Sequence, residues 1–191
     1  MTQKPVPVYW NTLTHQQWTL YLAATDNGLC CITLPNETFD TMNQWILKHV
    51  HGAVLSHDPI KLEPYQREIV EYLSGQRQTF TCPLDLRGTP FQVQVWQTLM
   101  QIPFGVVKSY SDVAAQIGHP TAVRAVGTAN GANPIPIIVP CHRVIGKNGT
   151  LTGYRGGFDI KTALLNLEGI ATLPHHDAAL HSREDIVCYT P

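Results

Sequence analysis

The proline-rich apolar stretch NPIPIIVPCHRVI, residues 133–145, decides how this chain is interpreted. Its three prolines stiffen the backbone, and its short β-branched run is typical of a buried strand or extended segment. The run ends at Cys141, with a proline before it and His142 after it. A cysteine in this position is either a reactive nucleophile or a small buried hydrophobic residue.

The reactive interpretation needs a base and a carboxylate close to Cys141. A thiol attacks as the thiolate, and the imidazole of His142 can accept its proton. A carboxylate on the other ring nitrogen would fix the tautomer of the histidine. Glu168 is the candidate, because a carboxylate at a helix C-terminus is otherwise disfavoured by the helix dipole. Adjacent residues of an extended chain point to opposite sides, so we expect a water molecule between thiol and imidazole.

The chain after this stretch has the pattern of a turn, a loop and a helix. Residues 147–150 (KNGT) predict a hairpin turn returning the chain to residues 151–152, and residues 153–157 predict a loop able to approach another group closely. Apolar residues at 160, 163, 164 and 167 have the spacing of an amphipathic helix. Gly169 closes this helix directly after Glu168.

Helices are also predicted before the stretch. Residues 89–99 begin with a Thr-Pro cap and carry apolar side chains on one face. Residues 109–112 (SYSD) predict a capping box that starts a second helix, and a third helix runs over about 120–131. The last two helices resemble a helix-turn-helix. Arg124 in the third helix is either a recognition residue or an ordinary exposed arginine.

Residues 1 to about 85 predict a small α/β domain. A hairpin is expected over residues 18–34, around the turn sequence Asp-Asn-Gly. Apolar spacing favours helices over 39–50 and 65–73, and a short strand is expected near 79–84. Its cysteines Cys30, Cys31 and Cys82, like Cys188 near the C-terminus, are interpreted as structural.

Composition narrows the possible classes of function. The 191 residues are 43% hydrophobic, enough for a packed core, but no run approaches the roughly 20 apolar residues of a membrane helix. No apolar segment follows the N-terminal residues, so no signal peptide is expected. The five cysteines include no C-x-x-C pair, which argues against a disulfide framework or zinc ribbon and favours a reducing cytosol. Residues 85–170 hold 7 Lys and Arg against 4 Asp and Glu, which permits a phosphate-binding face.

Residues 137–146 (IIVPCHRVIG) resemble the active-site signature of the O6-alkylguanine-DNA alkyltransferases, the methylated-DNA–protein-cysteine methyltransferases. The N-terminal region has a similar layout but no diagnostic residues. The resemblance extends through residues 86–91, 109–110, 124–127, 133–134, 153–154, 164–165 and 168–169.

This resemblance implies a DNA-repair methyltransferase of α/β class. A small N-terminal α/β domain (1–85) is expected to precede a mainly helical DNA-binding domain (86–171) with a helix-turn-helix and a short hairpin at the active site, and then a tail (172–191). Such a protein binds double-stranded DNA through the minor groove, flips out O6-alkylguanine, and transfers the alkyl group irreversibly and stoichiometrically to Cys141. The sequence leaves activity on O4-methylthymine open. We expect a cytoplasmic monomer without cofactor, metal or membrane contact.

The resemblance also assigns individual residues. It makes Cys141 the acceptor, His142 a base acting through water, and Arg124 the residue that replaces the flipped base. Arg155 lies at a variable position, where it would contact a phosphate or stay solvated. The catalytic positions match Cys141, His142, Glu168, Asn133 and Tyr110. The DNA-binding positions match Arg124, Tyr110, Ser111, Thr121, Ala122, Gly127 and Asn130. The pocket positions match Val144, Tyr154, Arg155 and Gly156.

Two other classes of protein are compatible with parts of the sequence. A cysteine hydrolase would use Cys141 and His142 with Glu168 as orienting carboxylate, and would turn over small esters or peptides. A DNA-binding module would contain a merely structural Cys141. The length of the motif favours the alkyltransferase. That function requires the sulfur to be held ionised at the floor of a cavity just wide enough for an extruded purine, with an opening beside the second of the paired helices.

Overall fold

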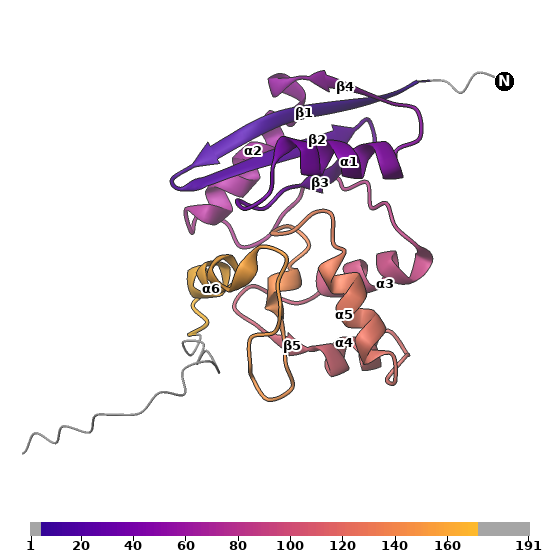
Figure 1. Cartoon of the computed structure of the whole chain (residues 1–191). Helices are drawn as coiled ribbons and strands as arrows, with labels where there is room; N and C mark the ends of the chain where they lie inside the picture. Colours follow the sequence, from indigo (N-terminus) through magenta and orange to yellow (C-terminus); the bar gives the residue numbers. More distant parts are fainter. Residues whose placement is uncertain (1–4, 172–191) are drawn as a thin grey trace, which may run out of the picture.

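The computed structural model describes residues 5–171, and its N-terminal part is a four-stranded sheet (Figure 1). The strands are β1 (Val6–His15), β2 (Trp18–Thr25), β3 (Gly28–Ile32) and β4 (Ala53–His57), in the spatial order β3-β2-β1-β4. The strands β1, β2 and β3 pair antiparallel, whereas β4 pairs parallel with β1. A parallel strand needs a crossover, and helix α1 (Phe39–His49) lies in the connection that reaches it.

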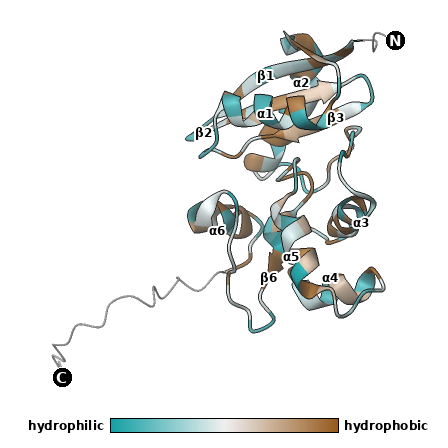
Figure 2. Ribbon diagram, turned by 45° about the vertical axis from the view of Figure 1, so that its right-hand side comes forward, coloured by the Kyte–Doolittle hydropathy of each residue, from teal (hydrophilic) through white to brown (hydrophobic). Residues whose placement is uncertain are grey.

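Helices α1 and α2 (Pro59–Leu73) pack on opposite faces of this sheet. Successive residues of a strand point to opposite faces, so Ala23 contributes to the core under α1, whereas Leu22 faces α2. The side of α1 away from the sheet is polar, and Figure 2 shows this helix with both hydrophilic and hydrophobic turns. The sheet is therefore covered on both sides, and α2 also faces the second half of the molecule.

The second half is mainly helical and lies on one side of the sheet layer (Figure 1). Capping boxes at Thr89 and Ser109 begin α3 and α4, as the sequence predicts. The indole of Trp96 donates to the Ala129 carbonyl at 2.8 Å and ties α3 to α5. The elements are α3 (Pro90–Leu99), β5 (Lys108–Ser109), α4 (Tyr110–Gln116), α5 (Val123–Gly131), the 3-10 helix η1 (Cys141–Arg143), β6 (Val144–Ile145) and α6 (Gly157–Leu167).

One hydrophobic core joins the two halves. It contains Leu22 of the sheet, Ile69 of α2, Val95 of α3 and Leu164 of α6, all fully buried. At roughly 25 cal/mol per Å² of apolar surface, burying each such side chain contributes about 2 kcal/mol. The helical second half therefore packs directly on α2 and shares its hydrophobic core.

The α/β class, the β2–β3 hairpin and the predicted helices are confirmed. The third helix of the sequence prediction begins at Val123 instead of about 120. Strands β1 and β4 were not predicted. Strand β1 ends in a turn at Gln16, whose φ of 51° is unusual for a residue other than glycine. The turn contains none of the usual turn residues, so the sequence did not indicate that a strand ends there.

Three predictions of local structure are wrong. The strand expected near 79–84 is not formed, since the backbone amides of Thr81 and Cys82 donate to the Glu68 carboxylate instead. The run 135–139 is a buried turn, because Ile137 adopts a φ of 76°. The hairpin predicted at the active site lacks its second strand. The Gly146 amide donates to the Thr150 carbonyl across the turn, but β6 pairs parallel with β5 and not with the residues after the turn.

No helix within residues 5–171 is long and apolar enough to cross a membrane. The predicted tail and Cys188 lie outside the described residues. The predicted boundaries of the two domains and the tail stay predictions.

Gly28 is essential to the β2–β3 turn. Its φ is +141°, and a Cβ there would lie 2.5 Å from the backbone oxygen of Pro83. We expect Gly28→Ala to lower the free energy of unfolding by about 3 kcal/mol or more, from combined strain and overlap. The matched control is Gly75→Ala, also at positive φ but with no atom within 4 Å, which should cost about 1 kcal/mol. Urea denaturation of both variants tests this, and equal losses would contradict it.

Candidate active site

Asn133 folds the proline-rich stretch into the turn that presents Cys141. Its Oδ1 accepts from the Ile135 amide at 3.0 Å, and its Nδ2 donates to the Val139 carbonyl at 2.8 Å. The Pro134 carbonyl accepts from the Ile32 amide at 2.8 Å, which docks the turn on β3. Cys141 then begins the 3-10 helix η1. Asn133, which the resemblance assigns to a catalytic position, therefore satisfies the backbone of a buried loop in this structure.

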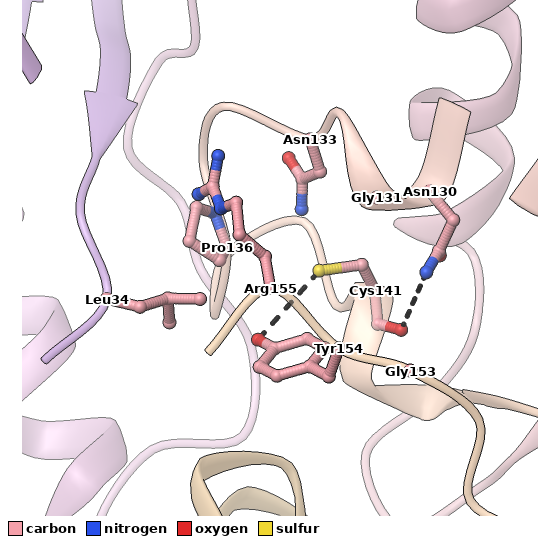
Figure 3. A pocket seen from close by; sticks show the side chains of 9 residues that line it. All are labelled: Leu34, Asn130, Gly131, Asn133, Pro136, Cys141, Gly153, Tyr154 and Arg155. Atoms are coloured by element: carbon pink, nitrogen blue, oxygen red, sulfur yellow. Dashed lines mark hydrogen bonds between the residues drawn. The ribbon is translucent and has the colours of Figure 1, made fainter. Parts of the chain in front are cut away.

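The sulfur of Cys141 lies in a pocket beside α5 (Figure 3). Its thiol donates to the Tyr154 hydroxyl at 3.9 Å, and the carbonyl of the same cysteine accepts from Asn130 Nδ2 at 3.3 Å. These contacts place the sulfur next to the second paired helix, as predicted. The cavity is smaller than predicted, because its volume of about 10 Å³ has room for about one water molecule and not for a purine. The pocket is lined by Leu34, Asn130, Gly131, Asn133, Pro136, Cys141, Gly153, Tyr154 and Arg155.

The thiol of Cys141 is protonated at neutral pH. Burial raises its pKa above the ordinary value, although hydrogen bonding with Asn133 and Tyr154 and the charges of Arg155 and Lys161 lower it. The prediction that the sulfur is held ionised is therefore wrong for the free protein, because the buried site provides too little solvation for a thiolate. Attack by this sulfur requires a base.

The position and the neutral state of His142 both suit a base. Its Nε2 lies 2.9 Å from Glu168 Oε1, and both side chains are fully buried. With the Nε2 proton donated to the carboxylate, Nδ1 is the free acceptor, and it is a buried atom without a partner among residues 5–171. Burial lowers the pKa of His142 while Glu168 raises it, and the net direction is downward. The imidazole is therefore neutral at pH 7, whereas the predicted intervening water stays a prediction.

Glu168 is held by more donors than the sequence analysis foresaw. Arg143 donates through Nε at 2.9 Å and Nη2 at 2.8 Å, the Gly105 amide at 3.1 Å, and the Tyr72 hydroxyl at 2.5 Å. Burial alone would raise the pKa of Glu168, but hydrogen bonds from His142, Arg143 and Tyr72 outweigh it and lower the pKa to about 2. The carboxylate is thus ionised at any physiological pH.

Three residues around the site were missed by sequence reasoning. Arg143 belongs to the quoted motif, and a buried arginine needs a carboxylate, so its pairing with Glu168 could have been deduced. Lys161 is fully buried in the amphipathic helix α6 and donates to the Val144 carbonyl at 2.7 Å; burial lowers its pKa to about 8. Tyr72 occupies an ordinary apolar position of α2 and gave no signal.

The pocket differs from the predicted one. Tyr154 and Arg155 line it as expected, but Val144 and Gly156 do not. Val144 is buried in β6, and Gly156 is buried close to Leu34 and Ile160. Arg155 is exposed, and its Nε also pairs with Glu37 Oε1 at 3.1 Å. The loop is thereby attached to the N-terminal half.

The predicted DNA-binding residues lie mostly on one exposed segment. Arg124 and Thr121 are exposed, and Ser111, Ala122 and Gly127 are partly exposed. The hydroxyl of Tyr110 lies 2.8 Å from Thr152 Oγ1, and its ring packs near Gly127. Asn130 was wrongly placed on the DNA surface, because it is buried and lines the pocket. Within residues 5–171, no group of three or more His, Cys, Asp or Glu side chains is placed to hold a metal ion.

Comparison with known proteins matches both halves of the chain. Residues 8–86 match the 6-O-methylguanine DNA methyltransferase ribonuclease-like domain, and residues 90–170 match the DNA-binding domain of the same family. The inducible methylated-DNA–protein-cysteine methyltransferase of Bacillus subtilis (strain 168) is 51% identical over 178 residues, covering 91% of this chain and 99% of that protein. The Mycobacterium bovis methylated-DNA–protein-cysteine methyltransferase is 60% identical over 152 residues, covering 78% and 92%.

Solved structures agree with these sequence matches. The Mycobacterium tuberculosis O6-methylguanine methyltransferase superposes with a TM-score of 0.73 at 42% identity, covering 84% of this chain and 92% of that one. M. tuberculosis OGT in complex with DNA gives a TM-score of 0.71 at 40% identity, covering 87% and 96%. The chain belongs to the 6-O-methylguanine DNA methyltransferase family.

The ionised Glu168 makes a testable contribution to stability. Its pKa of about 2 lies below the ordinary value of 4.5, so its stabilisation is fully present above about pH 4.5 and is lost as the pH falls through about 2. We expect Glu168→Gln to cost about 3 kcal/mol of unfolding free energy at neutral pH, because Arg143 and His142 lose their buried partner.

This cost should shrink when urea denaturation is repeated at progressively lower pH. The matched control is Glu63→Gln, which removes an exposed carboxylate paired with Arg67 on α2 and should change stability by less than about 0.5 kcal/mol. A cost for Glu168→Gln that does not vary with pH would contradict the expected charge linkage.

Proposed function

We propose that Cys141 accepts the alkyl group of O6-alkylguanine in double-stranded DNA, in a single irreversible transfer that consumes one chain for each lesion. The proposal rests on one observation: the thiol lies in a pocket beside a helix of the helix-turn-helix, next to a neutral histidine oriented by a buried carboxylate. Family membership supplies the class of reaction. Whether O4-methylthymine is also accepted depends on the fit of a pyrimidine in the same pocket.

The reaction is an in-line displacement at the alkyl carbon. A bond forms between Cys141 Sγ and that carbon, and the bond from carbon to guanine O6 breaks. His142 Nδ1 takes the thiol proton through a water molecule, and guanine departs with a proton on its ring, so the net reaction moves one proton from thiol to base. The thioether product does not hydrolyse at neutral pH, which makes the transfer single-turnover.

The surrounding residues lower the barrier by fixed geometry. Glu168 holds the tautomer of His142 that keeps Nδ1 free and stabilises the imidazolium while it exists. Asn133 and Tyr154 offer polar hydrogens near the sulfur, which favour the thiolate as it forms. The developing charge is therefore compensated by groups already in place, and no cofactor or metal is needed in the proposed reaction.

We further propose that α5 enters the minor groove of the duplex and that Arg124 fills the space left by the flipped guanine. Arg124 is exposed on α5, on the same helix whose Asn130 and Gly131 line the pocket. A flipped base would thus travel a short path from the groove to Cys141. Flipping costs a few kcal/mol, least for a damaged base pair. The M. tuberculosis OGT structure in complex with DNA supports DNA as the partner.

Tyr110 and the exposed end of the helix pair complete this proposed surface. The hydroxyl of Tyr110 lies 2.8 Å from Thr152 Oγ1, next to Gly153 of the pocket wall, which suits a residue that meets the flipped base. Ser111, Thr121 and Ala122 would contact phosphates or sugars. We propose that the protein acts as a monomer in the cytoplasm, where it has access to chromosomal DNA.

Intact mass after incubation with duplex DNA carrying O6-methylguanine tests the proposed transfer. We expect one methyl adduct per chain, stoichiometric with protein, located on Cys141 by peptide mapping and absent in Cys141→Ser. The control is Cys82→Ser, which removes another cysteine outside the pocket and should leave the adduct intact. Multiple turnovers with small esters would favour a hydrolase, and DNA binding without an adduct would favour a binding module.

Arg124→Ala distinguishes a role of this residue in base flipping from a role in alkyl transfer itself. We expect it to slow repair of the duplex by about tenfold or more, since base flipping loses a stabilising contact of at least roughly 1.4 kcal/mol. Reaction with free O6-benzylguanine should be nearly unchanged, because that substrate needs no flipping. Arg67→Ala, an exposed arginine on α2, serves as the matched control and should alter neither rate. Equal losses on both substrates would contradict the role of Arg124.

A further inference from the structure

A phenol from the N-terminal half reaches the acid–base pair of the catalytic half. Tyr72 lies near the end of α2 and is completely buried. Its hydroxyl donates to Glu168 Oε1 at 2.5 Å and lies 3.4 Å from His142 Nε2. The residue is part of the segment that matches the ribonuclease-like domain, whereas Cys141, His142 and Glu168 belong to the DNA-binding domain.

The Tyr72 hydroxyl and His142 compete for one oxygen atom. Glu168 Oε1 accepts from the phenol, from His142 Nε2 at 2.9 Å and from Arg143 Nη2 at 2.8 Å. Every donor that shares this oxygen reduces the negative charge available to the imidazole. The basicity of His142 therefore depends on how many other donors the carboxylate has.

Packing alone does not account for the hydroxyl. The ring of Tyr72 contacts Phe80 and Phe104, with centroids 5.2 and 6.2 Å away, and a phenylalanine would fill the same space. Burying a hydroxyl costs free energy unless it is hydrogen-bonded, and here its partner is the catalytic carboxylate. Burial and the charge of Glu168 raise the pKa of Tyr72, so the phenol stays a neutral donor throughout the working pH range.

We infer that Tyr72 is a positioning residue for alkyl transfer, which fixes Glu168 Oε1 and limits the basicity of His142. This inference rests on the proposed function of Cys141 and His142. It also gives the N-terminal half a direct part in the chemistry. The phenol acts through the carboxylate and need not touch the substrate.

The charged groups that face His142 are few. Glu168 lies on its Nε2 side, Arg143 follows it in η1, and Lys161 approaches from α6. Both cations disfavour a second positive charge on the imidazole, as does burial. Replacing Tyr72 by phenylalanine changes none of these charges, so a change in the titration of His142 reports the loss of the hydroxyl contacts with Glu168 and His142.

The test is the pH dependence of the reaction of Tyr72→Phe with free O6-benzylguanine. Without the phenol, Oε1 binds the imidazolium more strongly, so the acid limb of the profile should move to higher pH by about half a unit. Because the base must be neutral to take the thiol proton, the rate on that limb should fall about threefold. The matched control is Tyr65→Phe on the same helix, whose hydroxyl has no hydrogen bond within residues 5–171, and its profile should match that of the unaltered protein.

A second variant tests the inference even if Tyr72→Phe does not fold. Incorporation of 2,3-difluorotyrosine at position 72 keeps the shape and strengthens the donor, so the acid limb should move to lower pH. NMR titration of the His142 ring should follow the same two directions. An unshifted limb in both variants, or a slowing equal at all pH values, would overturn the inference. Failure of the unaltered protein to form the Cys141 adduct would instead refute the proposed function.

Discussion

A single buried carboxylate organises the catalytic half of this protein. Glu168 collects donors from α2, from η1 and from the Gly105 backbone, which lie far apart in sequence. An isolated carboxylate in this interior would be too costly, and the surrounding donors reverse that penalty. The same contacts orient His142 and neutralise Arg143, so the proposed acid–base chemistry and the assembly of the two halves depend on one group.

A separate feature, the loop before η1, positions the proposed nucleophile Cys141. The prolines and Asn133 shape a buried loop in which Asn133 satisfies the backbone groups that would otherwise lack partners. This loop docks on β3 through Pro134 and Ile32, and Cys141 lines the pocket although it is buried at the edge of the hydrophobic core. A protonated thiol in such a place is stable until a base and an electrophile are both present.

The family and the residues of the proposed chemistry could be predicted from the sequence because they follow local motifs. Cys141, His142 and Asn133 lie within one short stretch, and Glu168 follows a helix whose periodicity is clear. Features set by distant partners were not predictable in the same way. Thr81 was expected in a strand, but its amide bonds to Glu68, and Ile137 was expected to be extended, but it adopts a left-handed conformation. Tyr72 has the pattern of any core residue, and only the packing of α2 against α6 and η1 gives its hydroxyl a role.

The pocket wall includes Leu34, which comes from the segment just after β3, and the facing loop is held by the Arg155–Glu37 ion pair. One side of the substrate cavity is thus built by a part of the chain that carries no nucleophile, acid or base. The size of acceptable alkyl groups can therefore diverge between relatives through substitutions at such positions. At the proposed site, selectivity can therefore change at positions such as Leu34 and Glu37 without replacement of a reacting group.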